Sequence, residues 1–244
     1  MTSAAKTKFL LASNIVLVVV IVFLLLKNRT SAKPEAVPAA QEEKPHHYTD
    51  NGQYVEQVDF YSVFNTKAKI VFLGNSHFYR MNWDELLGRK DVANRGIGSD
   101  ITEGYKARMS SVLSTQPKIC FIEGGGNDID FKVSEDSIIR NLREISDTLK
   151  AHQIKPVLTA VFFAGRNYPH NDSNKYNLQV ASLNKAMHQL AERDSIEIID
   201  INNQLNEQDY LKPEFVRNDG IHLTSKAYLI WKDAVEKVLS KEQL

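Results

Sequence analysis

Short apolar runs of strand length alternate with helical patterns through most of this chain. Five runs have the composition of buried strands, and they cover residues 69–73, 91–94, 118–123, 156–163 and 196–200. Three stripes with apolar residues every three or four positions are typical of amphipathic helices, and a fourth helix is expected at about 102–113; the stripes cover residues 138–149, 180–190 and 227–238. Strands separated by helices pair in parallel through right-handed crossovers. The pattern therefore predicts an α/β fold, a three-layer α/β/α sandwich around a five-stranded parallel sheet.

The beginning of the chain differs from this pattern. Residues 9–26 form an apolar run without a charged side chain, and a helix of that length spans roughly 27 Å, close to the hydrocarbon thickness of a bilayer. A cleaved signal peptide has a shorter apolar region followed by a small-residue cleavage site, whereas Lys27 and Arg29 follow here. We therefore expect a single transmembrane signal-anchor helix after a short tail at residues 1–8. Basic residues flank both ends of the run and give no orientation, but a large domain behind such an anchor usually lies outside the cytoplasm.

The segment at residues 27–56 has no apolar periodicity and contains Pro34, Pro38 and Pro45. Such a composition buries too little apolar surface to offset the entropy lost on ordering. We expect a flexible tether here, followed by one globular domain at residues 57–244.

Charge and cysteine content exclude several functions. Lys and Arg together number 30, and so do Asp and Glu. The resulting net charge of zero lacks the basic excess of a nucleic-acid-binding protein. Cys120 is the single cysteine, which excludes an internal disulfide and a zinc site built on several thiolates.

Four clusters rich in glycine and polar residues follow the predicted strands. Residues 74–77, 96–100 and 124–128 come directly after the first three strands, and residues 218–222 lie just before the last helix. Each cluster alone is consistent with an ordinary turn, because glycine tolerates positive φ. Ligands bind parallel α/β sheets beyond the carboxyl ends of the strands, so we expect the clusters to meet in one cleft.

The side chains in these clusters suit acyl transfer. The hydroxyl of Ser76 is a weak nucleophile that needs a neighbouring base. His222 can be this base, and Asp219 can orient the imidazole and stabilise its cation. A tetrahedral intermediate also needs donors for its oxyanion, which the side-chain amide of Asn127 and the backbone N–H groups of Ser76 and Ser99 can supply.

In these residues, and in their order, the chain resembles the SGNH/GDSL hydrolase family over about residues 70–239. The resemblance implies a flavodoxin-like sandwich and a serine hydrolase that needs no metal or organic cofactor. It also implies that Ser76 is the nucleophile, that Asp219 and His222 complete the triad, and that Asn127 is an oxyanion donor. We accordingly expect an esterase or acylhydrolase that removes a small acyl group, such as O-acetyl, from a glycan or another ester.

Two positions depart from the family pattern. Asn75 stands where the family usually carries aspartate, and Ser99 stands at the oxyanion glycine, where a side chain restricts φ. A catalytically impaired carbohydrate-binding module and an acyltransferase on the same scaffold therefore stay open as alternatives. Of the remaining polar residues, His77 is expected at the rim of the cleft or as a helix cap, and Glu123 in a structural role.

Overall fold

The computed structural model describes residues 18–27, 46–64, 66–169 and 172–244. The chain divides into two units, Met1–Lys44 and Pro45–Leu244. In the first unit residues 18–27 are helical, and no helix in the described ranges is long and apolar enough to cross a membrane. The predicted tail at residues 1–8, residues 9–17 of the predicted anchor and residues 28–45 of the predicted tether lie outside the described residues.

The second unit contains the predicted five-stranded sheet. Its strand order is β2-β1-β3-β4-β5, and all pairs are parallel. The strands are β1 (Ile70–Gly74), β2 (Val92–Gly96), β3 (Ile119–Glu123), β4 (Lys155–Thr159) and β5 (Glu197–Ile199). Because β1 pairs with both β2 and β3, the winding of the sheet reverses beside β1. Doubly wound sheets bind ligands at this kind of switch point, beyond the carboxyl ends of the strands.

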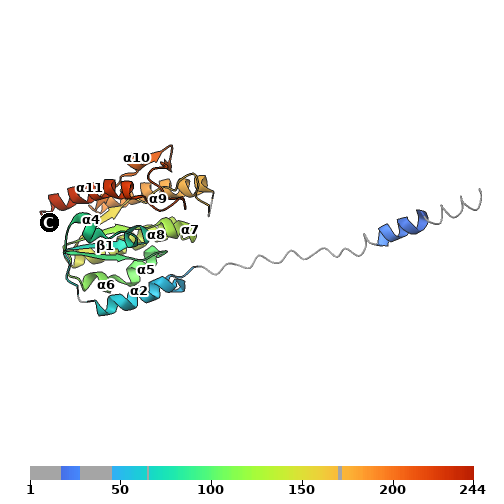
Figure 1. Cartoon of the computed structure of the whole chain (residues 1–244). Coiled ribbons are helices and arrows are strands. Elements are labelled where there is room, and N and C mark those ends of the chain that lie inside the picture. The colour runs from blue at the N-terminus through green and yellow to red at the C-terminus, as the bar shows by residue number, and fades with distance from the viewer. Residues whose placement is uncertain (1–17, 28–45, 65, 170–171) are drawn as a thin grey trace, which may run out of the picture. The chain divides into compact units, whose positions relative to one another are not determined.

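Helices cover both faces of the sheet, so the predicted three-layer sandwich is confirmed. The helices and the short accessory strands are η1 (Tyr48–Asp50), α2 (Gly52–Val63), α3 (Ser76–Tyr79), α4 (Trp83–Leu87), α5 (Thr102–Ala107), α6 (Met109–Leu113), α7 (Gly126–Asp130), α8 (Glu135–Ala151), α9 (Ser173–Arg193), α10 (Asn202–Leu205), α11 (Ser225–Lys241), β6 (Asn206–Glu207) and β7 (Tyr210–Leu211). Figure 1 shows α11 on one side of β1 and α5 and α6 on the other.

The alternation of side chains along the strands divides the interior into two cores. On β1, Ile70 and Phe72 face a core with residues of α3, α4 and α11. Val71 and Leu73 face a second core with residues of α5, α6, α8 and α9. Phe72 stacks on Trp83 with ring centroids 4.2 Å apart. All five residues of β1 are buried, which fixes the position of the chain that leaves its carboxyl end.

The predicted helix at 102–113 is two helices, α5 and α6. Arg108 interrupts it with a φ of −107°, and its guanidinium turns inward to donate to Asp100 Oδ2 at 2.8 Å. The break between the two helices thus coincides with the buried ion pair of Arg108 and Asp100. The helical spacing of apolar residues carries no signal for such a pair.

The folded unit begins before the predicted boundary at residue 57. Residues 48–50 form η1, and α2 starts at Gly52. Tyr54 and Tyr61 of α2 are buried in a small third core with Ile97. The apolar stripe of α2 is weak, because it consists of a few aromatic side chains on a short helix. The sequence pattern therefore did not separate α2 from the proline-containing segment before it.

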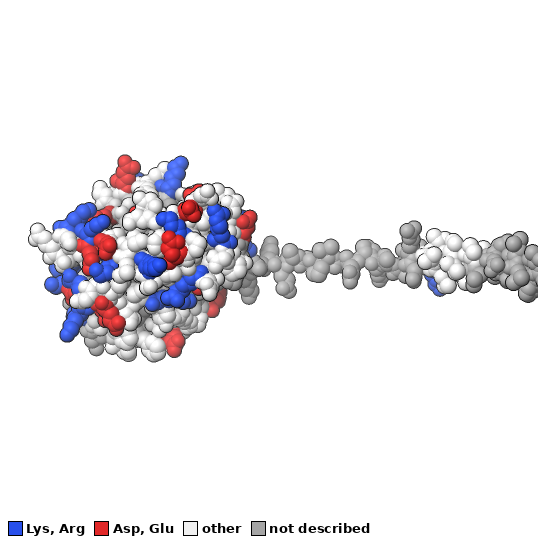
Figure 2. Space-filling model, turned by 45° about the horizontal axis from the view of Figure 1, so that its top comes forward, with Lys and Arg blue, Asp and Glu red and all other residues white. Residues whose placement is uncertain are grey.

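Opposite charges are intermingled on one face of the folded unit (Figure 2). Figure 2 shows Lys and Arg beside Asp and Glu, without a broad patch of one sign on the face in view. This distribution agrees with the balanced composition of the chain.

Candidate active site

Ser76 is the first residue of α3 and stands directly beyond the end of β1. Asn75 caps this helix, and its side-chain oxygen accepts the N–H of His77 at 2.8 Å. Asparagine thus provides the capping acceptor at the position where the family usually carries aspartate. Gly96 at the end of β2 lets the helix approach the sheet closely, because a Cβ there would lie 2.3 Å from the backbone nitrogen of Tyr79. Cap and close packing together hold Ser76 at the edge of the sheet.

Three side chains form a continuous chain of hydrogen bonds at this edge. His222 Nε2 lies 2.9 Å from Ser76 Oγ, and His222 Nδ1 lies 2.9 Å from Asp219 Oδ2. The other carboxylate oxygen of Asp219 accepts the backbone N–H groups of Ile221 at 3.1 Å and of His222 at 2.9 Å. The turn therefore orients the carboxylate and the imidazole together, as the three-residue spacing predicts.

The electrostatics of this turn favour a neutral imidazole and an ionised carboxylate. Partial burial works against the charge of Asp219, but the hydrogen bonds from His222 and Ile221 outweigh it and lower the pKa of Asp219 to about 2. Burial is the largest cause that lowers the pKa of His222, with the hydrogen bond to Asp219 opposing it. Because a carboxylate only accepts, Nδ1 carries the proton toward Asp219, and Nε2 is left to accept the proton of Ser76. This arrangement can activate a serine hydroxyl.

The predicted oxyanion donors border the same cavity, which has a volume of about 480 Å³. Its lining includes Ser76, Ser99, Asn127, Asp219 and His222. The side-chain amide of Asn127 is oriented by a hydrogen bond that Nδ2 donates to the carbonyl of Asp100 at 2.9 Å. The second proton on this nitrogen stays available.

Ser99 adopts a left-handed backbone, with φ +57°. This is the region that glycine enters without steric cost and that other residues enter rarely. The serine at this position therefore holds the backbone conformation for which glycine is suited, and the residue lines the cavity.

A buried polar network supports the loops that carry these donors. Arg108 donates to Asp100 at 2.8 Å, to the carbonyl of Arg95 at 2.6 Å and to the carbonyl of Gly74 at 3.1 Å. It thereby ties the ends of β1 and β2 to the loop that ends at Asp100. Asp100 in turn accepts Asn127 through its carbonyl, so the network fixes the amide at the cavity.

The structure places three residues at or beside the site that the sequence did not predict there. Gln53 of α2 lines the cavity, and its neighbour Asn51 donates from Nδ2 to the carbonyl of Gly98 at 2.7 Å. Both lie far from the motifs in sequence, and no local signal marks them. His77 is buried beneath the site, so its expected place at the rim is wrong. Its backbone belongs to α3, whose tight packing on the sheet directs the ring inward.

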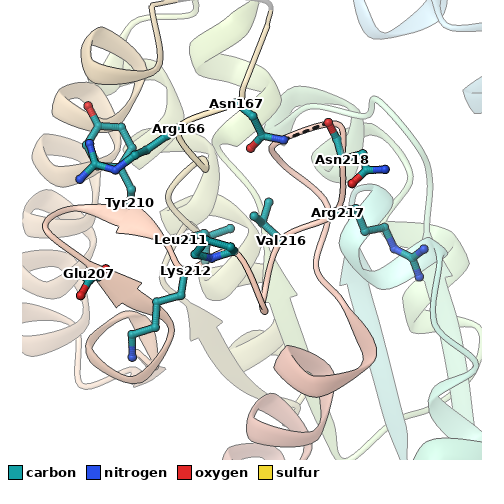
Figure 3. A pocket seen from close by; sticks show the side chains of 10 residues that line it. Arg166, Asn167, Glu207, Tyr210, Leu211, Lys212, Val216, Arg217 and Asn218 are labelled. Atoms are coloured by element: carbon teal, nitrogen blue, oxygen red, sulfur yellow. Dashed lines mark hydrogen bonds between the residues drawn. The ribbon is translucent and has the colours of Figure 1, made fainter.

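A second cavity of about 390 Å³ adjoins the turn that carries Asp219. Asn167 donates to the carbonyl of Asn218 at 3.0 Å, and Figure 3 shows this bond at one end of the cavity. Arg166 and Arg217 both line it, but their guanidinium groups point in different directions (Figure 3) and do not converge on one ligand position. The lining contains no serine, cysteine or histidine, so the reactive groups belong to the first cavity.

In the described part of the chain, no three His, Cys, Asp or Glu side chains gather as a metal site would require.

Comparison with known proteins places this chain in a family. The sequence profile of the GDSL-like lipase/acylhydrolase family matches residues 73–230, which include Ser76, Ser99, Asn127, Asp219 and His222. The chain belongs to the GDSL-like lipase/acylhydrolase family. A relative from Escherichia coli (strain K12), thioesterase 1/protease 1/lysophospholipase L1, is 28% identical over an alignment of 171 residues that covers 66% of this chain and 77% of that protein.

Several solved structures share the fold. A GDSL-like lipase from Bacteroides thetaiotaomicron superposes with a TM-score of 0.68 at 20% identity, covering 78% of this chain and 98% of that one. A putative acylhydrolase from Bacteroides fragilis gives 0.68 at 23% identity, covering 81% and 99%. An acetylxylan esterase from Geobacillus stearothermophilus gives 0.58 at 18% identity, covering 71% and 94%. At these identities the structures establish the fold, and the family match together with the thioesterase relative identifies the protein as an ester-hydrolysing enzyme.

Proposed function

We propose that the protein is a serine esterase in which Ser76 is the nucleophile, His222 the general base and Asp219 the residue that orients it. The supporting observation is the uninterrupted chain from Ser76 Oγ through the imidazole to the carboxylate, with both links at 2.9 Å. His222 takes the proton of Ser76 as Oγ bonds to the ester carbonyl carbon. The same proton then passes to the leaving alcohol as the ester C–O bond breaks.

The second half of the reaction regenerates the enzyme. His222 removes a proton from water, the hydroxide adds to the acyl carbon, and the carboxylic acid leaves as the proton returns to Ser76 Oγ. The backbone N–H groups of Ser76 and Ser99 and the amide of Asn127 stabilise the oxyanion in both halves. The three residues that carry these donors line the same cavity, which supports this role.

The proposed substrate carries a small acyl group, such as acetyl, on a hydroxyl-rich alcohol such as a glycan. The cavity is lined by polar groups that can bind hydroxyls, including Gln53, Arg80 and Asp130. The fold similarity to an acetylxylan esterase agrees with this substrate class. We also propose that residues 9–26 anchor the enzyme in a membrane, with the folded unit outside the cytoplasm; recovery of the full chain in a soluble fraction without detergent contradicts this part.

The assay is hydrolysis of nitrophenyl esters by the full chain, with Ser76→Ala and His222→Ala as the variants. Each should lower turnover of nitrophenyl acetate by a factor on the order of 10³ or more, while unchanged circular dichroism shows that folding is intact. Nitrophenyl octanoate should be the poorer substrate for the wild type. A fluorophosphonate probe should label the wild type and not Ser76→Ala. Full activity in Ser76→Ala refutes the mechanism, and failure of the wild type to label or to turn over favours a binding module.

A further inference from the structure

A buried histidine lies directly behind the serine. His77 follows Ser76 in α3 and is 6% exposed. Its Nδ1 lies 3.5 Å from Glu123 Oε1, and its Nε2 lies 3.2 Å from the carbonyl oxygen of Ile221. Ile221 belongs to the turn between Asp219 and His222. The His77 ring therefore connects the end of β3 to the turn that carries the base.

Glu123 makes this contact unusual. The residue is 1% exposed, and neither of its carboxylate oxygens has a hydrogen-bond partner among the described residues. A buried carboxylate without donors is costly, and a neighbouring cation offsets that cost. His77 is the basic side chain that contacts it.

The groups that contact the His77 ring favour its protonated form. The carboxylate of Glu123 and the carbonyl of Ile221 are both acceptors. A neutral imidazole that donates Nε2–H to the Ile221 carbonyl would turn the lone pair of Nδ1 toward the carboxylate, whereas an imidazolium turns an N–H and a positive charge toward it. The 3.5 Å between Nδ1 and Glu123 Oε1 is an ion-pair distance and not a hydrogen bond. The two contacts of His77 thus match the protonated ring.

We propose that His77 is a positioning residue of the esterase: as an imidazolium paired with Glu123, it holds the Ile221 carbonyl in the base-carrying turn and places a positive charge beside His222. This inference rests on the proposed function, because it assigns His222 the role of base. The rings of His77 and His222 are 5.7 Å apart between centroids. A positive charge at that distance disfavours a second positive charge on His222, so the base stays neutral and active to lower pH.

Groups from every neighbouring element bear on this charge. Burial disfavours the cation at His77, but Glu123 and the Ile221 carbonyl outweigh it and raise its pKa. After burial, the charges of His77 and Arg80 contribute to the lowered pKa of His222, against Asp219. The remaining neighbours are the Phe162 ring, 5.3 Å away between centroids, the Tyr228 hydroxyl, which donates to the His77 carbonyl at 2.6 Å, and, near Glu123, the hydroxyls of Tyr105 and Tyr176.

The test is the pH profile of kcat/KM for nitrophenyl acetate between pH 4.5 and 8.5. In the wild type kcat/KM should fall on the acid side of the profile, here called the acid limb, with a midpoint below pH 6.5, the ordinary pKa of histidine. His77→Gln removes the charge but keeps an amide donor for the Ile221 carbonyl, and Glu123→Gln removes the partner that holds the proton on His77. Both variants should move the acid limb to higher pH. A unit charge 5.7 Å away, in surroundings between those of a protein surface and water, gives a shift of about 0.5 to 2 pH units for His77→Gln.

His152→Gln is the matched control, because His152 is an exposed residue at the end of α8 and its loss should leave the profile unchanged. An unmoved acid limb in both buried variants, including a uniform loss of rate at every pH, overturns the role of His77. If neither variant folds, ¹⁵N-histidine NMR of the wild type decides: imidazolium shifts for His77 at pH 7 support the proposal, and neutral shifts overturn it. Loss of the proposed function is a separate outcome, since it appears as activity or probe labelling retained in Ser76→Ala.

Discussion

Replacement of Arg108 by methionine tests how the loop between β2 and α5, which carries Ser99 and Asp100, is held in place. The side chain of Arg108 and that of Asp100 are both fully buried, 2.8 Å apart. Arg108→Met keeps most of the apolar volume but leaves the Asp100 carboxylate without its cation. Removal of one partner from a buried pair costs about 3–5 kcal/mol, which is a large part of the total stability of about 5–15 kcal/mol of a typical domain.

Urea unfolding, followed by the fluorescence of the buried Trp83 and Trp231, measures the change. Lys106→Met is the control from the same helical segment, because Lys106 pairs with Glu144 at 2.9 Å at the surface and such pairs contribute about 0–1 kcal/mol. If Arg108→Met costs no more than Lys106→Met, the argument is refuted. The double variant with Asp100→Asn should recover part of the loss, because the unpaired charge is then absent.

The loss in Arg108→Met should also depend on pH. Burial raises the pKa of Asp100 to about 6 even with Arg108 beside it, and removal of the cation raises it further. A carboxyl group with a folded pKa above its unfolded value binds a proton on folding, so its cost is small at low pH and grows as the pH rises through the folded pKa. The destabilisation should therefore be smaller at pH 5 than at pH 8, and an equal loss at both contradicts this account.

Two further predictions concern the loop around Ser99. Because Ser99 has a φ of +57°, Ser99→Gly should raise the free energy of unfolding by up to about 1 kcal/mol and Ser99→Val should lower it by about 1–2 kcal/mol; equal stabilities in urea contradict the left-handed backbone. Asn51→Ala removes the 2.7 Å bond to the Gly98 carbonyl and should lower kcat/KM for nitrophenyl acetate about 5- to 10-fold, as loss of about 1 kcal/mol of support would. Asn82→Ala, at an exposed position, should have no such effect. Identical kinetics in the two asparagine variants would show that the contact from Asn51, at the start of α2, does not support the site.

The sequence alone determined the five parallel strands, the two-sided burial of the sheet and the edge at which the polar clusters meet. These features depend on local patterns: apolar runs of strand length, helical stripes, and glycine-rich turns at strand ends. The Asp219–His222 pair is local as well, because a single turn carries both side chains. A chain of this pattern therefore predicts the placement of Ser76, Ser99, Asn127, Asp219 and His222 at one cavity, and the structure brings all five there.

Only the tertiary structure decided the contacts between residues distant in the chain. Asn51 reaches the loop at Gly98, Arg108 turns inward and divides a predicted helix, and His77 lies between Glu123 and the turn at Ile221. None of these has a periodic signal, because each depends on one buried polar side chain meeting a specific partner. Such partners are set by the packing of the layers, where an unpaired buried polar group is costly and a paired one is stable.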